Sequence, residues 1–443
     1  MNFIFCVLVL CSCISSINAQ QCPDNFAGTK SLYEQQQREY VKPPKGYKPV
    51  FINYVGRHGA RHLTKDVNTS FAYQLLEKAN NTGALTDKGK ELRSMVLSLE
   101  KIEKTNFKSI SYEGQQELAG IAVRMYTNFT PIFLNNKFTA VEITKEKRTG
   151  QSATAFVNSL KVSINSKDSV YQYINDTTLR FYDLSPAYLE VEKEGDWHRS
   201  IENLRESFGL DNIINKTSDL FFTNSFSITL TKQQRIDFTN DIFGFITILP
   251  SIRKEIAKES INEGKLNFQS FYTCDELLKL GMLDNAEDFS LKGPATNNNG
   301  IQVRIAAPLL MDFIRCTDQF IHHNGSAIKL RFAHAETVAP FAAILNIKGA
   351  DNSVSTIDSF NLFWKAEEIV PLSANIQWAL YKKKKDFLIK ILLNEKEVAI
   401  DGMKAKNFPY YSWKQLRKFY LLRLHLGGLD IDDDYNLYLR NLK

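Results

Sequence analysis

The feature that most constrains the fold of this chain is a set of short apolar runs, each followed closely by polar residues. Residues 50–55, Val-Phe-Ile-Asn-Tyr-Val, lead directly into Gly-Arg-His-Gly-Ala-Arg. A second run, at 327–332, ends just before His334, and a third, at 140–143, ends just before Arg148. Runs of this length are typical of buried strands, and open α/β sheets place their ligands beyond the carboxyl ends of such strands. We therefore expect three strand ends of one sheet to converge.

Helical spacing dominates between these runs and through the middle of the chain. At 443 residues, the chain is long enough for two domains or for one large domain with an insertion. We predict a mixed α/β sheet flanked by helices, built from residues 20–184 and 300–443, with a mainly helical domain inserted at 185–299. Within the two α/β parts we expect helices at 90–103 (with Thr86 as N-cap), 114–129, 149–160, 301–321 and 338–345, and antiparallel strands at 374–381 and 387–393.

The composition is that of an ordinary globular chain, and its charge says little about partners. Hydrophobic residues make up 44% and charged residues 23%, which allows a large core. The net charge of +6 is compatible with a small anionic ligand but does not single one out. We expect no nucleic-acid partner. The lysine run at 382–385 precedes an expected strand, and we interpret it as a solvated turn rather than a binding patch.

The first nineteen residues differ in character from the rest. Residues 1–19 carry no charged side chain, and the apolar run at 3–10 is followed by small and polar residues up to Ala19. This pattern resembles a signal peptide, although an n-region without Lys or Arg is unusual. The run is too short to span a bilayer comfortably, so an uncleaved anchor is the weaker alternative. We expect a secretory protein without a membrane span in its mature chain, either secreted or retained in the ER lumen or a lysosome.

Glycosylation acceptor patterns agree with the secretory route. Each Asn-x-Ser/Thr triplet is weak evidence alone, but several together with a leader carry more weight. The expected acceptors are Asn68, Asn80, Asn128, Asn175, Asn215 and Asn324.

Three cysteines remain after removal of the leader: Cys22, Cys274 and Cys316. An odd number permits at most one bridge within the chain. We pair Cys274 with Cys316. A chain of this size does not depend on disulfides for a stable core, so few bridges are expected.

The polar residues after the expected strands suit one kind of chemistry. A phosphomonoester carries up to two negative charges, so a neutral imidazole such as His58 attacks it more readily than an anion does. Arg57 and Arg61 flank this histidine and offer planar forks of donors that match phosphoryl oxygens. A poor leaving alkoxide needs a proton donor, and Glu336, two residues after His334, can supply the proton. Gly59 has no side chain, so we expect the backbone to approach a phosphate there.

These motifs make the chain resemble the histidine acid phosphatase superfamily, and within it the multiple inositol-polyphosphate phosphatase branch. The matching segments are Arg-His-Gly-Ala-Arg at 57–61, Glu-Lys-Arg-Thr at 146–149 with the following 152–156, and Arg-Phe-Ala-His-Ala-Glu-Thr at 331–337. The stretch at 392–396 also resembles that branch. The likeness extends from about residue 30 to about residue 435 and is weakest through the inserted domain.

The resemblance implies a role for each residue of the site. His58 would be the nucleophile that accepts the phosphate, and Glu336 would be the proton donor. The residues implied to bind phosphate are Arg57, Arg61 and Arg148, with His334 as a further donor. No metal or organic cofactor is implied, and the candidate ligands lack a recognisable metal-binding spacing. The implied substrates are inositol hexakisphosphate, lower inositol phosphates and 2,3-bisphosphoglycerate.

One departure from the family pattern and several alternatives stay open. The usual motif has a proline two residues after the second arginine, whereas His62-Leu63 follows Arg61 here, which leaves loop rigidity in question. His58 and His334 could be structural core histidines, and Glu336 could be a helix-start carboxylate. His62 is interpreted as supporting the site at most. The rival functions are a secreted acid phosphatase of broad specificity and an inactive glycoprotein that only binds anions. A mutase fits the leader and the sequons poorly.

Overall fold

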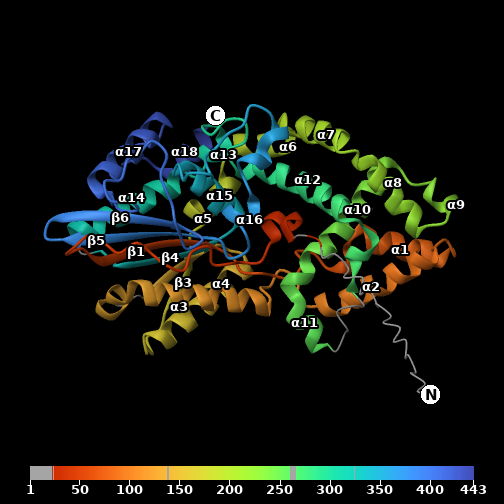
Figure 1. Ribbon diagram of the computed structural model, residues 1–443, viewed down its shortest axis with the longest axis horizontal. Coiled ribbons are helices and arrows are strands. Elements are labelled where there is room, and N and C mark those ends of the chain that lie inside the picture. Colours follow the sequence, from red (N-terminus) through yellow and green to blue (C-terminus); the bar gives the residue numbers. More distant parts are fainter. Residues whose placement is uncertain (1–21, 23, 137–138, 260–265, 324) are drawn as a thin grey trace, which may run out of the picture.

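The computed structural model describes residues 22, 24–136, 139–259, 266–323 and 325–443; the expected leader at 1–19 and the sequon at Asn324 lie outside them. One twisted eight-stranded sheet, with helices above and below it, forms the left half of the view in Figure 1. A mainly helical part forms the right half. The predicted class, a mixed α/β sheet flanked by helices, is confirmed.

Strand order explains how distant segments reach one edge of the sheet. Strands β1, β4, β2 and β3 run parallel, while β5 pairs antiparallel with β1 and β6 pairs antiparallel with β5. The carboxyl ends of the parallel strands therefore meet at the same edge, as the sequence predicted. Across the sheet the strands are β3 (Tyr171–Ile174), β2 (Ala140–Ile143), β4 (Ile328–Ala333), β1 (Lys48–Arg57), β5 (Asn375–Lys383), β6 (Asp386–Leu393) and β7 (Lys396–Glu397), with β8 (Tyr411–Ser412) beside β6.

Successive side chains of β1 point to opposite faces of the sheet, and each face packs into a different apolar core. Phe51 and Val55 belong to the core under α14 and α15, whereas Ile52 and Tyr54 belong to the core under α3 and α4. This alternation follows from the two-residue period of a strand. The helices that cover the sheet are α3 (Tyr112–Asn135), α4 (Lys147–Ser163), α13 (Ile301–Arg304), α14 (Ala307–His323), α15 (Ala335–Ile344), α17 (Trp413–Leu426) and α18 (Tyr435–Asn441), with the short α5 (Asp176–Leu179) and α16 (Ala366–Ile369) near the strand ends.

Most expected helices are present, and one is divided. Thr86 caps the helix that follows it, its side chain accepting from the Gly89 amide. The single helix expected at 301–321 is instead two helices, α13 and α14, separated at residues 305–306. Pro308 lies in the first turn of α14, where its missing N–H costs nothing, whereas deeper in a helix it would remove a hydrogen bond.

The helical part has its own apolar core, built from two distant stretches of sequence. Helices α1 and α2, which the sequence analysis placed with the sheet, pack against α8 and α10. The predicted helical character of 185–299 is confirmed, although α1 and α2 also contribute to this core. The helices of this part are α1 (Phe71–Asn81), α2 (Asp87–Glu103), α6 (Pro186–Glu194), α7 (Trp197–Ser207), α8 (Leu210–Phe221), α9 (Asn224–Ser227), α10 (Lys232–Ile248), α11 (Arg253–Lys258) and α12 (Cys274–Lys292). The buried side chains of α6 and α7 pack instead in the core under α14 and α15.

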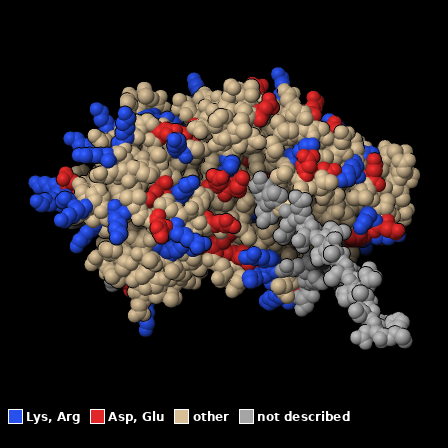
Figure 2. All heavy atoms as spheres, in the orientation of Figure 1, with Lys and Arg blue, Asp and Glu red and all other residues tan. Residues whose placement is uncertain are grey.

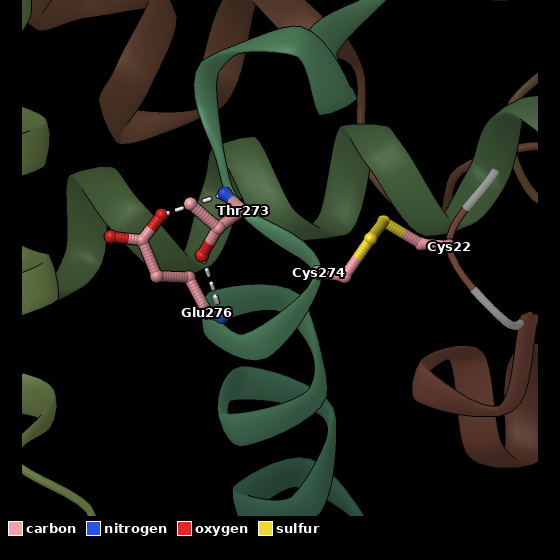
Figure 3. Close-up of a disulfide and its surroundings, with 4 residues drawn as sticks. All are labelled: Cys22, Thr273, Cys274 and Glu276. Carbon is pink, nitrogen blue, oxygen red and sulfur yellow. Dashed lines mark hydrogen bonds between the residues drawn. A yellow bond between two sulfur atoms is a disulfide. The ribbon is translucent and has the colours of Figure 1, made fainter. Parts of the chain in front are cut away.

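A disulfide joins the start of the chain to the start of α12, and the expected pairing was wrong. Cys274 bonds to Cys22, while Cys316 is a free, buried thiol in α14. The reason is tertiary: the 3-10 helix η1 (Asp24–Lys30) packs along α12 and brings the two Cα atoms to 5.3 Å. Figure 3 shows the bridge beside the capping box of α12, in which Thr273 and Glu276 satisfy each other's backbone N–H groups.

The lysine run at 382–385 lies at the exposed turn between β5 and β6, as expected. Lys382 lies opposite Lys48, the first residue of β1, whereas Arg57 ends that strand. The run is therefore at the far end of the sheet from the converging strand ends. Figure 2 shows basic side chains gathered at this left-hand end. Across the described residues, no helix has the length and apolar character required to cross a membrane.

Candidate active site

The strand ends bring the predicted residues together. Arg57 is the last residue of β1 and lies opposite Ala333, the last residue of β4. His58 and His334 follow these two strands, and their ring centroids are 5.6 Å apart. Arg148 comes from the first turn of α4, after β2, and reaches His334 with a 3.1 Å contact between Nη2 and Nδ1. The prediction that three strand ends converge is confirmed.

His58 is held as a neutral imidazole. Its backbone N–H donates to the Ala333 carbonyl, and its own carbonyl accepts from the Ser373 amide. Nδ1 lies 3.0 Å from the Gly59 carbonyl, which can only accept, so Nδ1 carries the proton and Nε2 keeps its lone pair. Burial, and then the neighbouring Arg57 and Arg148 charges, hold the pKa of His58 well below its ordinary value. A neutral imidazole with an available lone pair is the form that attacks phosphorus.

Acceptors of the protein satisfy only some of the hydrogen-bond donors of Arg57, Arg61 and Arg148. Arg57 donates through Nη1 to the carbonyls of Thr29 and Val370, and Arg61 donates to the His62 carbonyl at 2.8 Å. The Nε atoms of Arg57 and Arg148 are buried, and neither has an acceptor among the described residues. Burial, followed by repulsion from Arg57 and Arg148, lowers the pKa of Arg61 to about 10. A dianion placed among these cations would relieve their repulsion.

The loop that carries these residues is fixed by its contacts with α3 and α4. A side chain on Gly59 would meet the backbone of Gly114, within 2.8 Å of its Cα atom. A side chain is therefore excluded at Gly59 because α3 packs there, and the approach of its backbone to a phosphate stays a prediction. The Gly59 amide donates to Ser152 Oγ at 3.1 Å, and the Ala60 amide donates to the half-buried Glu117 carboxylate at 2.9 Å.

His334 is held between two elements by both ring nitrogens. An arginine can only donate, and the Arg148 contact with Nδ1 is shorter than the 3.4 Å contact of Arg180 with Nε2, so we assign Nδ1 of His334 as the acceptor and Nε2 as the protonated nitrogen. Nε2 lies 2.9 Å from Thr144 Oγ1, which can accept this proton because it can donate its own to Thr149 Oγ1. Burial and the Arg148 charge lower the pKa of His334 to about 3. His334 is therefore neutral and rigidly placed beside His58.

Glu336 lies in the first turn of α15, with its side chain 35% exposed. Burial acts to raise its pKa, but the ammonium group of Lys292, 3.2 Å away, more than offsets this and holds the pKa of Glu336 well below its usual range. The carboxyl is thus ionised before substrate binds. Its helix-start position and its place at the site coexist, so the two interpretations of this residue do not exclude each other.

His62 supports the loop rather than the anion site. Its ring is buried and contacts two carboxylates, with Nδ1 3.1 Å from Glu103 and Nε2 3.6 Å from Glu255. Burial alone would lower its pKa, but these two carboxylates raise the pKa to about 9. Glu103 also accepts from the Leu63 amide at 2.9 Å. The ion pairs fasten the segment after Arg61, where the family pattern has a proline.

Two residues at the site were missed by the sequence analysis. Arg180 bonds to Glu146 and lies 3.4 Å from Nε2 of His334. It follows β3, so the rule that strand ends carry ligands would have found it had β3 been recognised. Lys292 pairs with Asp288 at i,i+4 on α12. This spacing carries no functional signal, because Lys279 and Asp275 repeat it on the same helix at a more exposed position.

The described acceptor asparagines differ in their surroundings. Asn175 is half-buried, and its amide donates to Glu142 at 2.6 Å, so a glycan there would break this bond. The remaining described acceptors are exposed: Asn68, Asn80, Asn128 and Asn215. Glycosylation stays a prediction. Within the described ranges, no cluster of three His, Cys, Asp or Glu side chains has the geometry to hold a metal ion.

Comparison with known proteins gives one family and one fold. The family model "Histidine phosphatase superfamily (branch 2)" matches residues 214–394. No curated protein sequence matches the chain. The multiple inositol polyphosphate phosphatase of Bifidobacterium longum, solved with inositol hexasulfate, is 19% identical with a TM-score of 0.76, over 89% of this chain and 97% of that one.

Two further solved structures share this fold. The phosphate complex of the same Bifidobacterium longum enzyme has a TM-score of 0.74 at 19% identity, with the same shares of both chains covered. The phytase from D. castellii has a TM-score of 0.61 at 14% identity, over 90% of this chain and 85% of that one. The chain therefore resembles the histidine phosphatase superfamily in the sequence of residues 214–394, and it shares the fold of these enzymes over most of its length.

Proposed function

We propose that this chain is a phosphomonoester hydrolase that acts on inositol hexakisphosphate and lower inositol phosphates through a phosphohistidine on His58. One observation carries the proposal: a neutral imidazole with a free Nε2 lone pair, buried among Arg57, Arg61 and Arg148. The Bifidobacterium longum neighbour, which holds inositol hexasulfate, supports a polyanionic ring as the substrate class. The family resemblance adds 2,3-bisphosphoglycerate as a further candidate substrate.

The proposed reaction has two displacement steps at phosphorus. In the first, Nε2 of His58 forms a bond to phosphorus, the ester P–O bond breaks, and the leaving oxygen takes a proton from Glu336. In the second, Glu336 accepts a proton from water while the water oxygen attacks phosphorus and the P–N bond breaks. The guanidinium groups remain charged throughout and stabilise the transferring phosphoryl oxygens.

A substrate panel tests the proposal against the broad-specificity rival. We expect kcat/KM on inositol hexakisphosphate to exceed kcat/KM on a simple aryl phosphate by at least about tenfold, because several phosphates can share the cationic surroundings. Release of inorganic phosphate measures both rates. Comparable values would favour a broad acid phosphatase, whereas phosphate binding without any turnover would favour an inactive anion-binding protein.

A further inference from the structure

Lys292 occupies a position between the proposed proton donor and the helical part of the molecule. It lies at the end of α12 with its side chain 18% exposed. Its Nζ atom is 2.6 Å from Asp288 Oδ1 and 3.2 Å from Glu336 Oε1. A buried ammonium fixed by one carboxylate and shared with a second has little freedom to move. The Glu336 carboxyl is correspondingly restrained.

Asp288 links the same helix to the phosphate-binding side of the site. Its second oxygen, Oδ2, accepts from Thr29 Oγ1 at 2.8 Å. The carbonyl of Thr29 in turn accepts from Nη1 of Arg57. The end of α12 therefore contacts both Glu336 and, through η1, the first arginine. The Cys22–Cys274 bridge fastens η1 to the other end of α12.

We propose that Lys292 is a positioning residue for the proton transfer, which holds the Glu336 carboxylate in place until a monoanionic phosphate ester binds. This inference rests on the proposed function and assigns a step within it. A monoanionic ester brings its own proton: the P–OH proton moves to the Glu336 carboxylate, which leaves a dianionic phosphoryl group among the arginines. Attack by His58 then breaks the ester bond, and Glu336 returns the proton to the leaving oxygen.

The charges around Glu336 favour this order of events. Charged groups of α12, of β1 and of the loop after β1 act on Glu336 or on Lys292. A bound dianion would offset the cations among them, so that the pKa of Glu336 rises toward the range in which the carboxyl can hold a proton. Burial raises the pKa values of Tyr182 and Tyr188, so both phenols stay neutral. The titratable and charged groups that act on this pair are Asp284, Glu287 and Asp288 from α12, Arg57 and Arg61 from β1 and its loop, His334 after β4, Tyr182 from the 3-10 helix η3 (Phe181–Leu184) and Tyr188 from α6.

The test compares Lys292→Met, which removes the charge, with Lys292→Arg, which retains it. The pH dependence of kcat would be measured with inositol hexakisphosphate and with an aryl phosphate whose leaving group needs little protonation. For Lys292→Met we expect a fall in kcat of about 10- to 100-fold on the inositol phosphate and much less on the aryl ester. Lys292→Arg should restore most of the loss.

The pH profile gives a readout that a purely structural role would not move. Loss of the ammonium raises the Glu336 pKa. The fall of kcat on the alkaline side of the pH profile, its alkaline limb, should therefore occur at a pH about one unit higher in Lys292→Met than in the wild type. Lys279→Met is the matched control, because it removes an i,i+4 pair from an exposed part of the same helix. It should leave both kcat and the limb unchanged.

Different results would overturn the proposed function and the proposed role of Lys292. If the wild-type protein releases no phosphate from any ester, the proposed function fails. The role of Lys292 is wrong if the wild-type protein is active and Lys292→Met shows two results together. These are an alkaline limb of the kcat profile at the wild-type pH and an equal fall in kcat on both esters. Should Lys292→Met fail to fold, Asp288→Asn carries the same comparison, because it releases the ammonium from its anchor. Equal losses on both esters in that variant would also overturn the inference.

Discussion

Three buried histidines near the site differ in charge because their neighbours differ. His58 and His334 lie among guanidinium groups, which together with burial lower their pKa values and keep both rings neutral. His62 lies only four residues after His58, yet its two carboxylate partners raise its pKa to about 9. The same side chain is thus a neutral imidazole at the position of the proposed nucleophile and a cation paired with carboxylates at another.

The charge of His62 predicts a pH-dependent contribution to stability. Because the folded pKa of about 9 lies above the usual 6.5, the contribution is complete below about pH 6.5 and is lost as the pH rises through about 9. Replacing His62 with Gln should therefore cost about 2–3 kcal/mol of unfolding free energy at low pH. Urea unfolding of both proteins between about pH 5 and pH 10 measures the difference.

The gap between the two unfolding curves should narrow steadily toward alkaline pH. Exposed His425, which pairs with Asp430 on the surface, offers a matched control, and His425→Gln should cost less than about 1 kcal/mol. A constant gap across the whole range would show that the His62 cation contributes nothing.

Sequence motifs predicted the residues that act on a phosphate but not those that hold them. Arg57, His58 and Arg61 are contiguous, so a short pattern carries them. Lys292 and Glu117 reach the site from helices remote in sequence, and each would be an ordinary charged residue at most positions on a helix surface. Tertiary packing alone gives them their roles.

At the scale of elements, the close approach of α3 to the catalytic loop determines where the loop lies. A side chain on Gly114 would overlap the carbonyl oxygen of Ala60, and one on Gly59 would overlap Gly114. The two glycines therefore allow contact between backbones, from which Glu117, one turn further along α3, reaches the Ala60 amide. Hydrogen bonds and close packing together restrain the loop from which His58 acts.

Replacing Gly114 with Ala should displace the loop. We expect kcat/KM to fall by about 100-fold, since a shift of about 1 Å at a catalytic group has that effect. Gly120→Ala on the same helix is the control, because its added Cβ would meet only the flexible end of Arg124. That variant should keep full activity and gain up to about 1 kcal/mol in stability from the better helix propensity of alanine. Equal activity of the two variants would contradict the proposed role of this contact.

Element types were predictable where the apolar period was clear, and contacts between elements were not. Strand β1 and the helix after Thr86 follow directly from their periods and caps. The association of α1 and α2 with the helical core depends on side chains from α8 and α10, more than a hundred residues away. The Cys22–Cys274 pairing has the same origin, because spacing in sequence does not reveal that η1 packs along α12.

At the scale of the whole molecule, the sheet and the helical part supply different halves of the proposed chemistry. The strand ends contribute the nucleophile and the arginines, while α12 contributes Lys292 against the proton donor. The exposed lysines of the β5–β6 turn lie at the opposite end of the sheet and take no part (Figure 2). The proposed selection of a phosphate therefore depends on the charges at the site rather than on the overall net charge.

Trapping the covalent intermediate tests the central claim most directly. The protein would be mixed rapidly with radiolabelled inositol hexakisphosphate, denatured in alkali, which preserves phosphohistidine, and digested for peptide mapping. We predict label on the peptide that contains His58, in amounts that rise before steady-state turnover, and neither label nor turnover in His58→Ala. Full turnover in His58→Ala, or label on a different residue, would contradict the account.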